Sequence, residues 1–126
     1  MKKVILTENA PAPIGPYSQA VEMNGFVYCS GQIPLDAKTG EIIGENVEAQ
    51  TEKVMQNISE VLKAADLDFK SVIKTTIFIT DMANFQKLNA VYAKYFGDQP
   101  PARSTVAVRG LPKDVLVEIE VLAARG

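Results

Sequence analysis

The stretch that decides the fold closes the chain and reads Val115-Leu116-Val117-Glu118-Ile119-Glu120-Val121-Leu122-Ala123. Every second residue from Val115 to Ala123 is apolar, which is the period of a β-strand with one buried face. The other face carries Glu118 and Glu120 between two leucines. Apolar residues on both faces predict that both faces of the sheet are covered.

Upstream of this strand, the clearest local signals are a hairpin and a helix. Apolar-rich runs at 19–23 and 26–30 flank Asn24-Gly25, the preferred pair for a two-residue type I′ turn. A helix is expected to begin after Asn46 as its N-cap, with Glu48 in the first turn, and to end at Asp66. The helical spacing of its apolar residues predicts one buried face.

The remaining elements complete an α+β pattern. We predict strands at 4–6, 72–80, 104–108 and 115–123 and a second helix at 84–96. Gly97 is expected to end that helix as a left-handed residue. The strand at 72–80 is expected to place four residues on one face: Ile73, Thr75, Ile77 and Ile79. The order β-β-β-α-β-α-β-β predicts a single domain, 1–126, with a mixed sheet and both helices on one face. No segment then remains for the second face, so a second subunit is expected to cover it.

Composition restricts the chemistry. The 126 residues are 47% hydrophobic, include no histidine, and carry 13 basic and 15 acidic side chains. The absence of histidine excludes Ser-His-Asp and Cys-His catalysis and His-ligated metals, and the single cysteine excludes a thiolate cluster within one chain. The net charge of −2 argues against a sequence-independent nucleic-acid binder. Only three apolar residues precede Thr7-Glu8-Asn9, and no later run suits a membrane span, so we expect a cytoplasmic protein.

The glutamates of the last strand are the first candidates for chemistry. On a solvated face they would be ordinary surface residues. At the edge of a covered face they would lie roughly 6–7 Å apart along the strand. Partial burial and mutual repulsion would then raise the pKa of Glu118 or Glu120, as suits proton transfer or the orientation of water.

Three further residues stand out. Arg103 follows Pro100-Pro101, and its planar guanidinium is suited to bind a carboxylate ligand. The alternative, which spacing alone favours, is a surface arginine that forms an ion pair with a neighbouring Asp or Glu. Asn89 interrupts the apolar stripe of the second helix and is expected to hydrogen-bond a neighbouring loop. Cys29 is expected to be an inert, buried strand thiol.

Four blocks of sequence together resemble the RidA (YjgF) family of reactive-intermediate deaminases, and the resemblance extends over nearly the whole chain. The early blocks are Ile14-Gly15-Pro16-Tyr17-Ser18-Gln19-Ala20 and Ser30-Gly31-Gln32-Ile33-Pro34. The more specific late blocks are Pro101-Ala102-Arg103-Ser104 and Leu111-Pro112-Lys113-Asp114 through Val117-Glu118-Ile119-Glu120.

The resemblance implies a chorismate-mutase-like homotrimer with clefts between subunits. It implies hydrolysis of 2-enamine and 2-imine acids, such as 2-aminoacrylate, to 2-keto acids and ammonia, without a metal or other cofactor. By the same resemblance, Arg103 binds the substrate carboxylate and Glu118 positions or activates water. The residues implied to line the pocket are Tyr17, Ser30, Gly31 and Asn89. Thr105 stands where many relatives have a cysteine, so any thiol chemistry there is in doubt, while a small polar group remains.

Other functions remain open at this stage. The same cleft could bind 2-keto acids or related carboxylates in a regulatory role without turnover. An RNA-directed activity is reported for some relatives, although the acidic balance and the absence of histidine weigh against it. No feature of the sequence favours a chaperone-like role.

Overall fold

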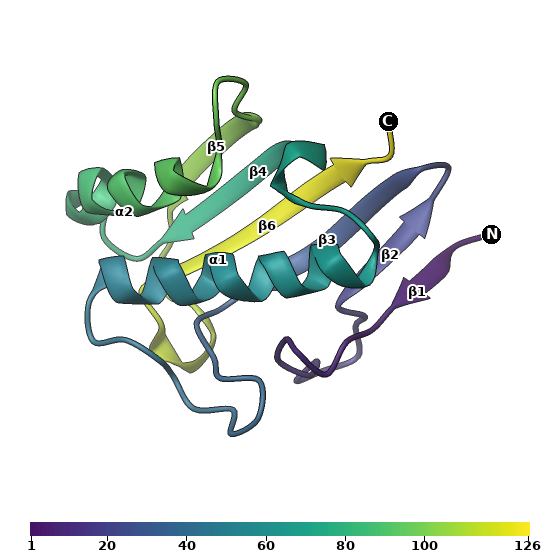
Figure 1. Ribbon diagram of the computed structural model, residues 1–126. Coiled ribbons are helices and arrows are strands. Elements are labelled where there is room, and N and C mark those ends of the chain that lie inside the picture. Colours follow the sequence, from purple (N-terminus) through teal and green to yellow (C-terminus); the bar gives the residue numbers. More distant parts are fainter.

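The computed structural model covers residues 1–126 and contains one six-stranded sheet and two α-helices (Figure 1). The strands are β1 (Lys3–Ile5), β2 (Ala20–Met23), β3 (Phe26–Gln32), β4 (Val72–Ile79), β5 (Ala102–Ala107) and β6 (Val117–Ala124). The helices are α1 (Val47–Ala64) and α2 (Phe85–Tyr92), with short 3₁₀ turns at Phe69–Ser71, Met82–Asn84, Ala93–Tyr95 and Pro112–Asp114. The predicted order of elements is confirmed.

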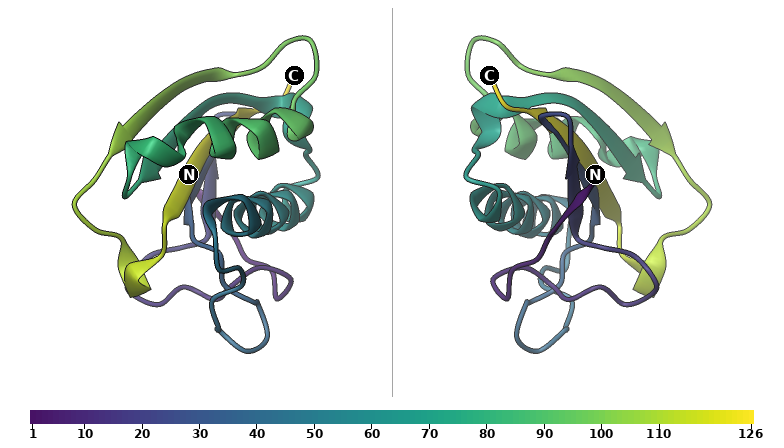
Figure 2. Two further views of the ribbon diagram at one scale, coloured as in Figure 1. Left: turned by 90° about the vertical axis from the view of Figure 1, so that its left-hand side faces the viewer. Right: turned by 90° about the vertical axis from the view of Figure 1, so that its right-hand side faces the viewer.

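The sheet is mixed, with strand order β1-β2-β3-β6-β4-β5. All neighbouring strands are antiparallel except β4 and β5, which run parallel. Both helices lie on the same side of this sheet (Figure 2), as the sequence predicts. The predicted apolar face of β6 packs under them in the main core, with Val117, Ile119 and Ala123 fully buried. The α+β arrangement therefore follows from one strand whose alternate residues are all apolar.

Local signals in the sequence place the hairpin and the first helix correctly. Asn24 and Gly25 both have positive φ, 53° and 82°, as a type I′ turn requires. The Asn46 side chain accepts a hydrogen bond from the Ala49 amide at 2.8 Å and caps α1. The helix ends where Asp66 turns to a φ of 59°.

The prediction for one residue of β4 is wrong. Thr75, Ile77 and Ile79 face the helices as expected, but Ile73 is 45% exposed while Val72 is buried. The pairing with β6 shifts register between Val72 and Lys74, so this segment contains one extra residue. Such a β-bulge changes which residues face the core, and strict alternation does not predict it.

The second helix is shorter than predicted, and Gly97 does not end it in a left-handed conformation. Helix α2 ends at Tyr92, a 3₁₀ turn continues to Tyr95, and Phe96 is extended with φ −124° and ψ 139°. Gly97 is not among the residues with positive φ. The Phe96 ring packs against Phe69 and Tyr92, and this packing holds the chain in an extended path.

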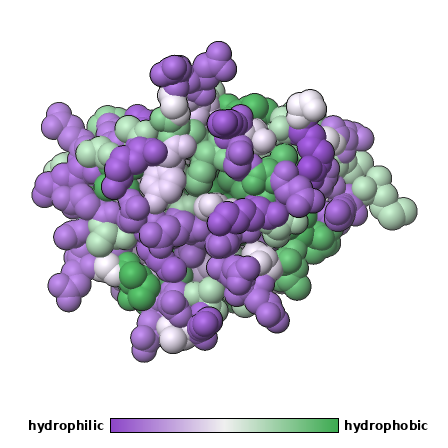
Figure 3. All heavy atoms as spheres, in the orientation of Figure 1, coloured by the Kyte–Doolittle hydropathy of each residue, from purple (hydrophilic) through white to green (hydrophobic).

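The face of the sheet away from the helices, here called the open face, exposes large apolar side chains. Phe26 and Tyr28 of β3 are 39% and 50% exposed, and Tyr28 pairs with half-buried Leu122 of β6. Leu116 instead packs against the main core, so it does not contribute to this surface as the sequence suggested. The helix side is mostly hydrophilic (Figure 3). Neither helix has the length and apolar character needed to cross a membrane.

Candidate active site

One group of the predicted site residues surrounds a cavity of 310 Å³, here called the Glu118 cavity. Its lining comes from the loop before β2, from the end of β3 and from the segment that enters β6. The lining residues are Ile14, Tyr17, Ser30, Gly31, Ile33, Pro112 and Glu118. Four of the residues that the sequence singles out, Tyr17, Ser30, Gly31 and Glu118, are therefore brought together.

A bulge in β3 shapes the floor of this cavity. The register with β6 shifts between Cys29 and Gln32, so Ser30 and Gly31 lie in an irregular segment. The Glu118 side chain lies directly over Gly31: a Cβ atom at position 31 would stand 2.8 Å from the Glu118 Cδ. Only glycine leaves room for the carboxyl in this position.

The Glu118 carboxyl is half-buried and belongs to none of the three ion pairs of the chain. Burial raises the pKa of Glu118 above its ordinary value of 4.5, and the charge of Glu120 raises it further. The two causes are those predicted from the strand pattern, and the shift falls on Glu118, whose neighbour Glu120 is exposed.

Hydrogen bonds hold the polar groups of the cavity in place. The Ser30 hydroxyl donates to the Ser18 carbonyl at 2.6 Å, so its oxygen is left to accept from a ligand. The Tyr17 hydroxyl accepts from the Ile14 amide at 3.1 Å, which ties these two lining residues together.

Three buried amide side chains anchor the walls of the Glu118 cavity. Gln19 bonds the loop from Thr7 to Pro11, which leads to Ile14 and Tyr17. Asn57 of α1 donates to the carbonyls on either side of Pro34, those of Ile33 and Leu35. Gln50 of α1 accepts from the amide of Leu116, two residues before Glu118, at 2.8 Å.

A second group surrounds Arg103 on β5. The Arg103 Nη1 donates to the Asn89 Oδ1 at 2.7 Å. Its guanidinium carbon lies 5.3 Å from the centre of the Phe85 ring and 5.1 Å from that of Tyr92, both on α2. Asn89 therefore contacts the arginine rather than a neighbouring loop, so that prediction is wrong.

Arg103 has no carboxylate partner. The three ion pairs of the chain involve Lys63, Lys94 and Arg125, so the alternative of an ion pair between Arg103 and a nearby Asp or Glu is wrong. On the same face of β5, the buried hydroxyl oxygen of Thr105 has no hydrogen-bond partner. A fixed cation beside an unused hydroxyl can receive an anionic ligand.

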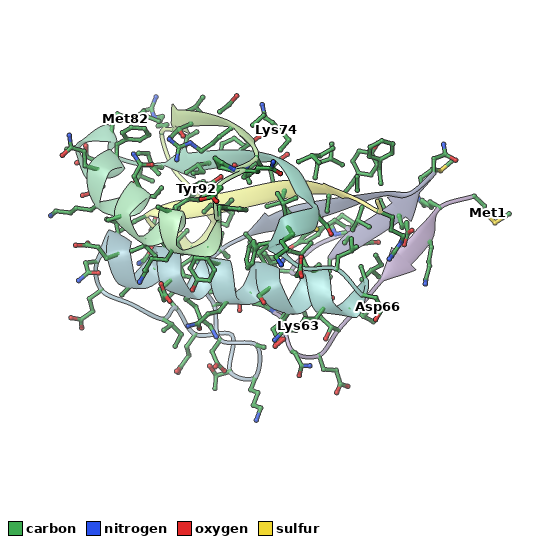
Figure 4. The ribbon with its side chains drawn as sticks, turned by 45° about the horizontal axis from the view of Figure 1, so that its top comes forward. Met1, Lys63, Asp66, Lys74, Met82 and Tyr92 are labelled. Atoms are coloured by element: carbon green, nitrogen blue, oxygen red, sulfur yellow. The ribbon has the colours of Figure 1, made fainter.

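The two groups lie on opposite faces of one sheet. Arg103 pairs with Thr75, which is buried beneath α2 and bonds the Tyr92 hydroxyl. Figure 4 shows Tyr92 on α2. Glu118 pairs with Phe78, three residues further along β4 and thus on the open face. Within one chain, therefore, Tyr17, Ser30, Gly31 and Glu118 do not meet Arg103, Asn89 and Thr105.

Two sets of contributing residues were not predicted from the sequence. The first set lines the Glu118 cavity and consists of Ile14, Ile33 and Pro112. Each of them belongs to one of the four family motifs, so their closeness in sequence to Tyr17, Gly31 and Glu118 could have indicated that they line the same cavity. Phe85 and Tyr92 flank Asn89 at helical spacing, which could have indicated a shared contact.

Outside the candidate site, Cys29 is buried at 7% exposure, and burial raises the pKa of its thiol to about 12, as expected of an inert residue. No group of three or more His, Cys, Asp or Glu side chains is arranged to hold a metal ion.

Comparison with known proteins identifies close relatives. The sequence model of the endoribonuclease L-PSP family matches residues 7–125. A RutC family protein of Pyrococcus horikoshii is 54% identical over 123 residues, which are 98% of this chain and 98% of that protein. The chloroplastic Reactive Intermediate Deaminase A of Arabidopsis thaliana is 49% identical over 122 residues, 97% of this chain and 65% of that protein.

The fold is also found among solved structures. The crystal structure of E. coli TdcF with bound serine superposes with a TM-score of 0.93 and 42% sequence identity. The alignment covers 98% of this chain and 99% of that one. The mixed sheet with two helices is thus the architecture of this group of proteins.

Proposed function

The chain belongs to the endoribonuclease L-PSP family, which includes the RutC and RidA proteins, and on that premise we propose that it hydrolyses 2-enamine and 2-imine acids. The products are 2-keto acids and ammonia. A general deaminase role is supported by the 49% identity to Reactive Intermediate Deaminase A. The serine bound to TdcF, a relative of 42% identity, indicates that this fold can hold a small amino acid.

The observation that carries the proposal is the unpaired guanidinium of Arg103. A buried or half-buried arginine ordinarily has an anionic partner, yet Arg103 bonds only the neutral amide of Asn89. A substrate carboxylate would supply that partner through a bidentate contact. The Thr105 hydroxyl, which has no hydrogen-bond partner in the chain and lies on the same face of β5, would be a second donor to the same anion.

The Glu118 carboxyl would carry out the proton transfers. Water adds through its oxygen to C2 of the protonated imine, while Glu118 accepts the proton that the water loses. The resulting carbinolamine receives that proton on nitrogen. As the C–N bond breaks, the carbinolamine hydroxyl passes its proton back to Glu118, which leaves the 2-keto acid and ammonia. Ammonia then takes this proton and departs as ammonium, which returns Glu118 to the carboxylate. A raised pKa suits a group that takes and returns a proton near neutral pH.

The two halves of the site need more than one subunit. The carboxylate of a 2-imino acid is bonded directly to the carbon that water attacks, so Arg103 and Glu118 must reach one small molecule. Because they lie on opposite faces of the sheet, the Arg103 of one subunit would meet the Glu118 cavity of another. We propose a homotrimer in which the open faces turn toward the threefold axis and cover Phe26, Tyr28 and Leu122, while the edge strand β5, which carries Arg103, borders the Glu118 cavity of the next subunit.

The test generates 2-aminoacrylate with a serine dehydratase and follows pyruvate formation. The wild-type protein is expected to accelerate pyruvate formation, and Arg103→Ala to remove the acceleration. Arg109→Ala is a matched control, because Arg109 is exposed in the loop after β5 and lines neither group. An unaccelerated wild type, or an undiminished Arg103→Ala variant, would contradict the proposal.

Two further measurements separate this function from the regulatory and RNA-directed alternatives. Binding of 2-ketobutyrate that depends on Arg103, without acceleration of pyruvate formation, would indicate a regulatory carboxylate-binding protein. An RNA-directed function would require RNA cleavage by highly purified protein that Glu118→Gln abolishes.

A further inference from the structure

We propose that Phe85 and Tyr92 of α2 are positioning residues that hold the Arg103 guanidinium in the orientation needed to bind a carboxylate. With Asn89 they form what we call the arginine clamp. The inference rests on the proposed function, since it assigns these residues a role in substrate binding that acts through Arg103.

The clamp is built into the spacing of α2. Phe85, Asn89 and Tyr92 stand at positions i, i+4 and i+7, so their side chains project from one face of the helix. All three contact the same guanidinium: two rings with centres 5.1 and 5.3 Å from its central carbon, and one amide oxygen 2.7 Å from Nη1. Three residues on one face of α2 therefore converge on one side chain of β5.

The position of the Tyr92 ring is itself determined by the sheet. Its hydroxyl forms a 2.8 Å hydrogen bond with Thr75 Oγ1, and Thr75 is the β4 residue paired with Arg103. Tyr92 is therefore tied to the strand adjacent to the arginine that it contacts. A buried tyrosine hydroxyl ordinarily needs a partner, and because this partner lies on the strand beside Arg103, the bond also fixes the ring against the guanidinium.

The contacts occupy the guanidinium without neutralising it. Aromatic rings attract the cation through their quadrupoles but carry no charge, and Asn89 takes only one of the five N–H donors. The remaining donors and the full positive charge are left for a carboxylate. A carboxylate side chain in place of either ring would form an ion pair and compete with the substrate.

The experiment measures 2-ketobutyrate binding by calorimetry and the kinetics of 2-aminoacrylate hydrolysis, using the whole protein. Phe85→Leu keeps an apolar side chain but removes the ring, and it is expected to raise Kd and KM about 5- to 30-fold, the size of a desolvated cation–π contact. The expected change in kcat is under twofold, because Phe85 does not touch the reacting atoms. Phe85→Tyr keeps a ring and is expected to restore binding.

Phe69→Leu is the control for a purely structural effect. Phe69 packs against Tyr95 and Phe96, and Phe96 in turn contacts Tyr92, but the Phe69 ring itself does not contact Arg103. The Phe69→Leu substitution is expected to lower the Tm of the protein without changing its Kd for 2-ketobutyrate. In NMR spectra, the Arg103 Nε–H signal is expected to lose the Phe85 contribution to its ring-current shift in Phe85→Leu, while the Tyr92 contribution remains, and to be unchanged in Phe69→Leu.

The outcomes are distinguishable. A wild type that binds 2-ketobutyrate but does not hydrolyse the imine contradicts the proposed function, while the Kd series still tests the clamp. Equal Kd values in wild type and Phe85→Leu would overturn the clamp alone, as would a parallel loss of binding in Phe69→Leu. A wild type without binding or hydrolysis would overturn both.

Discussion

At the scale of single residues, the candidate site depends on the packing of the Glu118 side chain over Gly31. The carboxyl of Glu118 occupies the volume that a side chain at position 31 would need. This packing helps to exclude water from one side of the carboxyl, and burial is the larger cause of its raised pKa. The absence of a side chain at Gly31 thus helps to raise the pKa of Glu118.

Replacing Gly31 by alanine is expected to displace Glu118 and lower kcat/KM about 10- to 100-fold, the effect of moving a catalytic group by about 1 Å. The measurement is pyruvate formation from 2-aminoacrylate. Gly97→Ala serves as the control, since a Cβ there would meet no atom within 4 Å, and it is expected to retain wild-type kinetics. Unchanged activity of Gly31→Ala would show that the position of the Glu118 carboxyl is not critical.

The raised pKa of Glu118 predicts how activity depends on pH. Water activation needs the carboxylate, so kcat is expected to rise with pH and to reach half its maximum above 4.5, the ordinary value for glutamate. Glu120→Gln removes the second cause of the shift and is expected to move this acid limb toward lower pH. A limb that does not move, or activity that falls across this range, would contradict the assignment.

The raised pKa of Glu118 also predicts how the stability of the fold depends on pH. A salt-bridged acid stabilises the fold as pH rises, whereas Glu118 is expected to destabilise it. The folded state holds the Glu118 proton more tightly than the unfolded chain, so the free energy of unfolding falls as pH rises from 4.5 through the raised pKa. Glu118→Gln cannot ionise and is expected to have a higher Tm than wild type at pH 7. Thermal unfolding between pH 4 and 7 tests this, with the two Tm values expected to converge at the acid end.

At the scale of elements, the loops of the Glu118 cavity depend on buried amides rather than on regular structure. Gln19, 1% exposed, makes four hydrogen bonds to the backbone of Thr7, Ala10 and Pro11. The proline-rich loop cannot form a regular ladder of its own. One side chain therefore replaces the missing backbone pairing.

Gln19→Leu is expected to lower the free energy of unfolding by about 2–4 kcal/mol, because buried backbone groups lose their partners. It is also expected to raise KM, since the loop carries Ile14 and Tyr17. Chemical denaturation and steady-state kinetics measure the two effects. Asn46→Ala, which removes the α1 cap, is expected to cost about 1 kcal/mol without raising KM.

Elements governed by local signals were predictable, and those governed by packing were not. The turn at Asn24-Gly25 and the cap at Asn46 depend on residues within a few positions. The bulge beside Ile73 and the extended Phe96 depend on the strand or rings that they pack against. Single-residue shifts of this kind leave no mark on hydrophobic periodicity.

At the scale of the whole molecule, the arrangement of the sheet separates the two halves of the candidate site. Strand β4 lies between β6 and β5, and residues paired across neighbouring strands point to the same face of the sheet. The register of β4 with its two neighbours therefore places Glu118 on one face and Arg103 on the other. An interface that joins the Arg103 side of one subunit to the Glu118 side of the next uses two different surfaces. Repetition of such an interface closes into a ring.

This geometry predicts complementation between two inactive variants. Arg103→Ala and Glu118→Gln chains, unfolded together and refolded at equal concentrations, are expected to recover about a quarter of wild-type activity, because one interface in four then joins two intact halves. Each variant refolded alone is the control. Sedimentation is expected to show a trimer throughout. No recovery in mixed trimers, or a stable monomer at micromolar concentration, would contradict an intersubunit site.

The sequence by itself determined the class of fold, the buried face of β6 and the residue types available for chemistry. These properties depend on periodicity and composition, which are local or additive along the chain. Only the tertiary structure decided that Arg103 is held by rings instead of an acid, that Glu118 lies over Gly31, and that these groups occupy opposite faces. Such relations arise from strand order and register, which join residues far apart in the chain and which no single segment specifies.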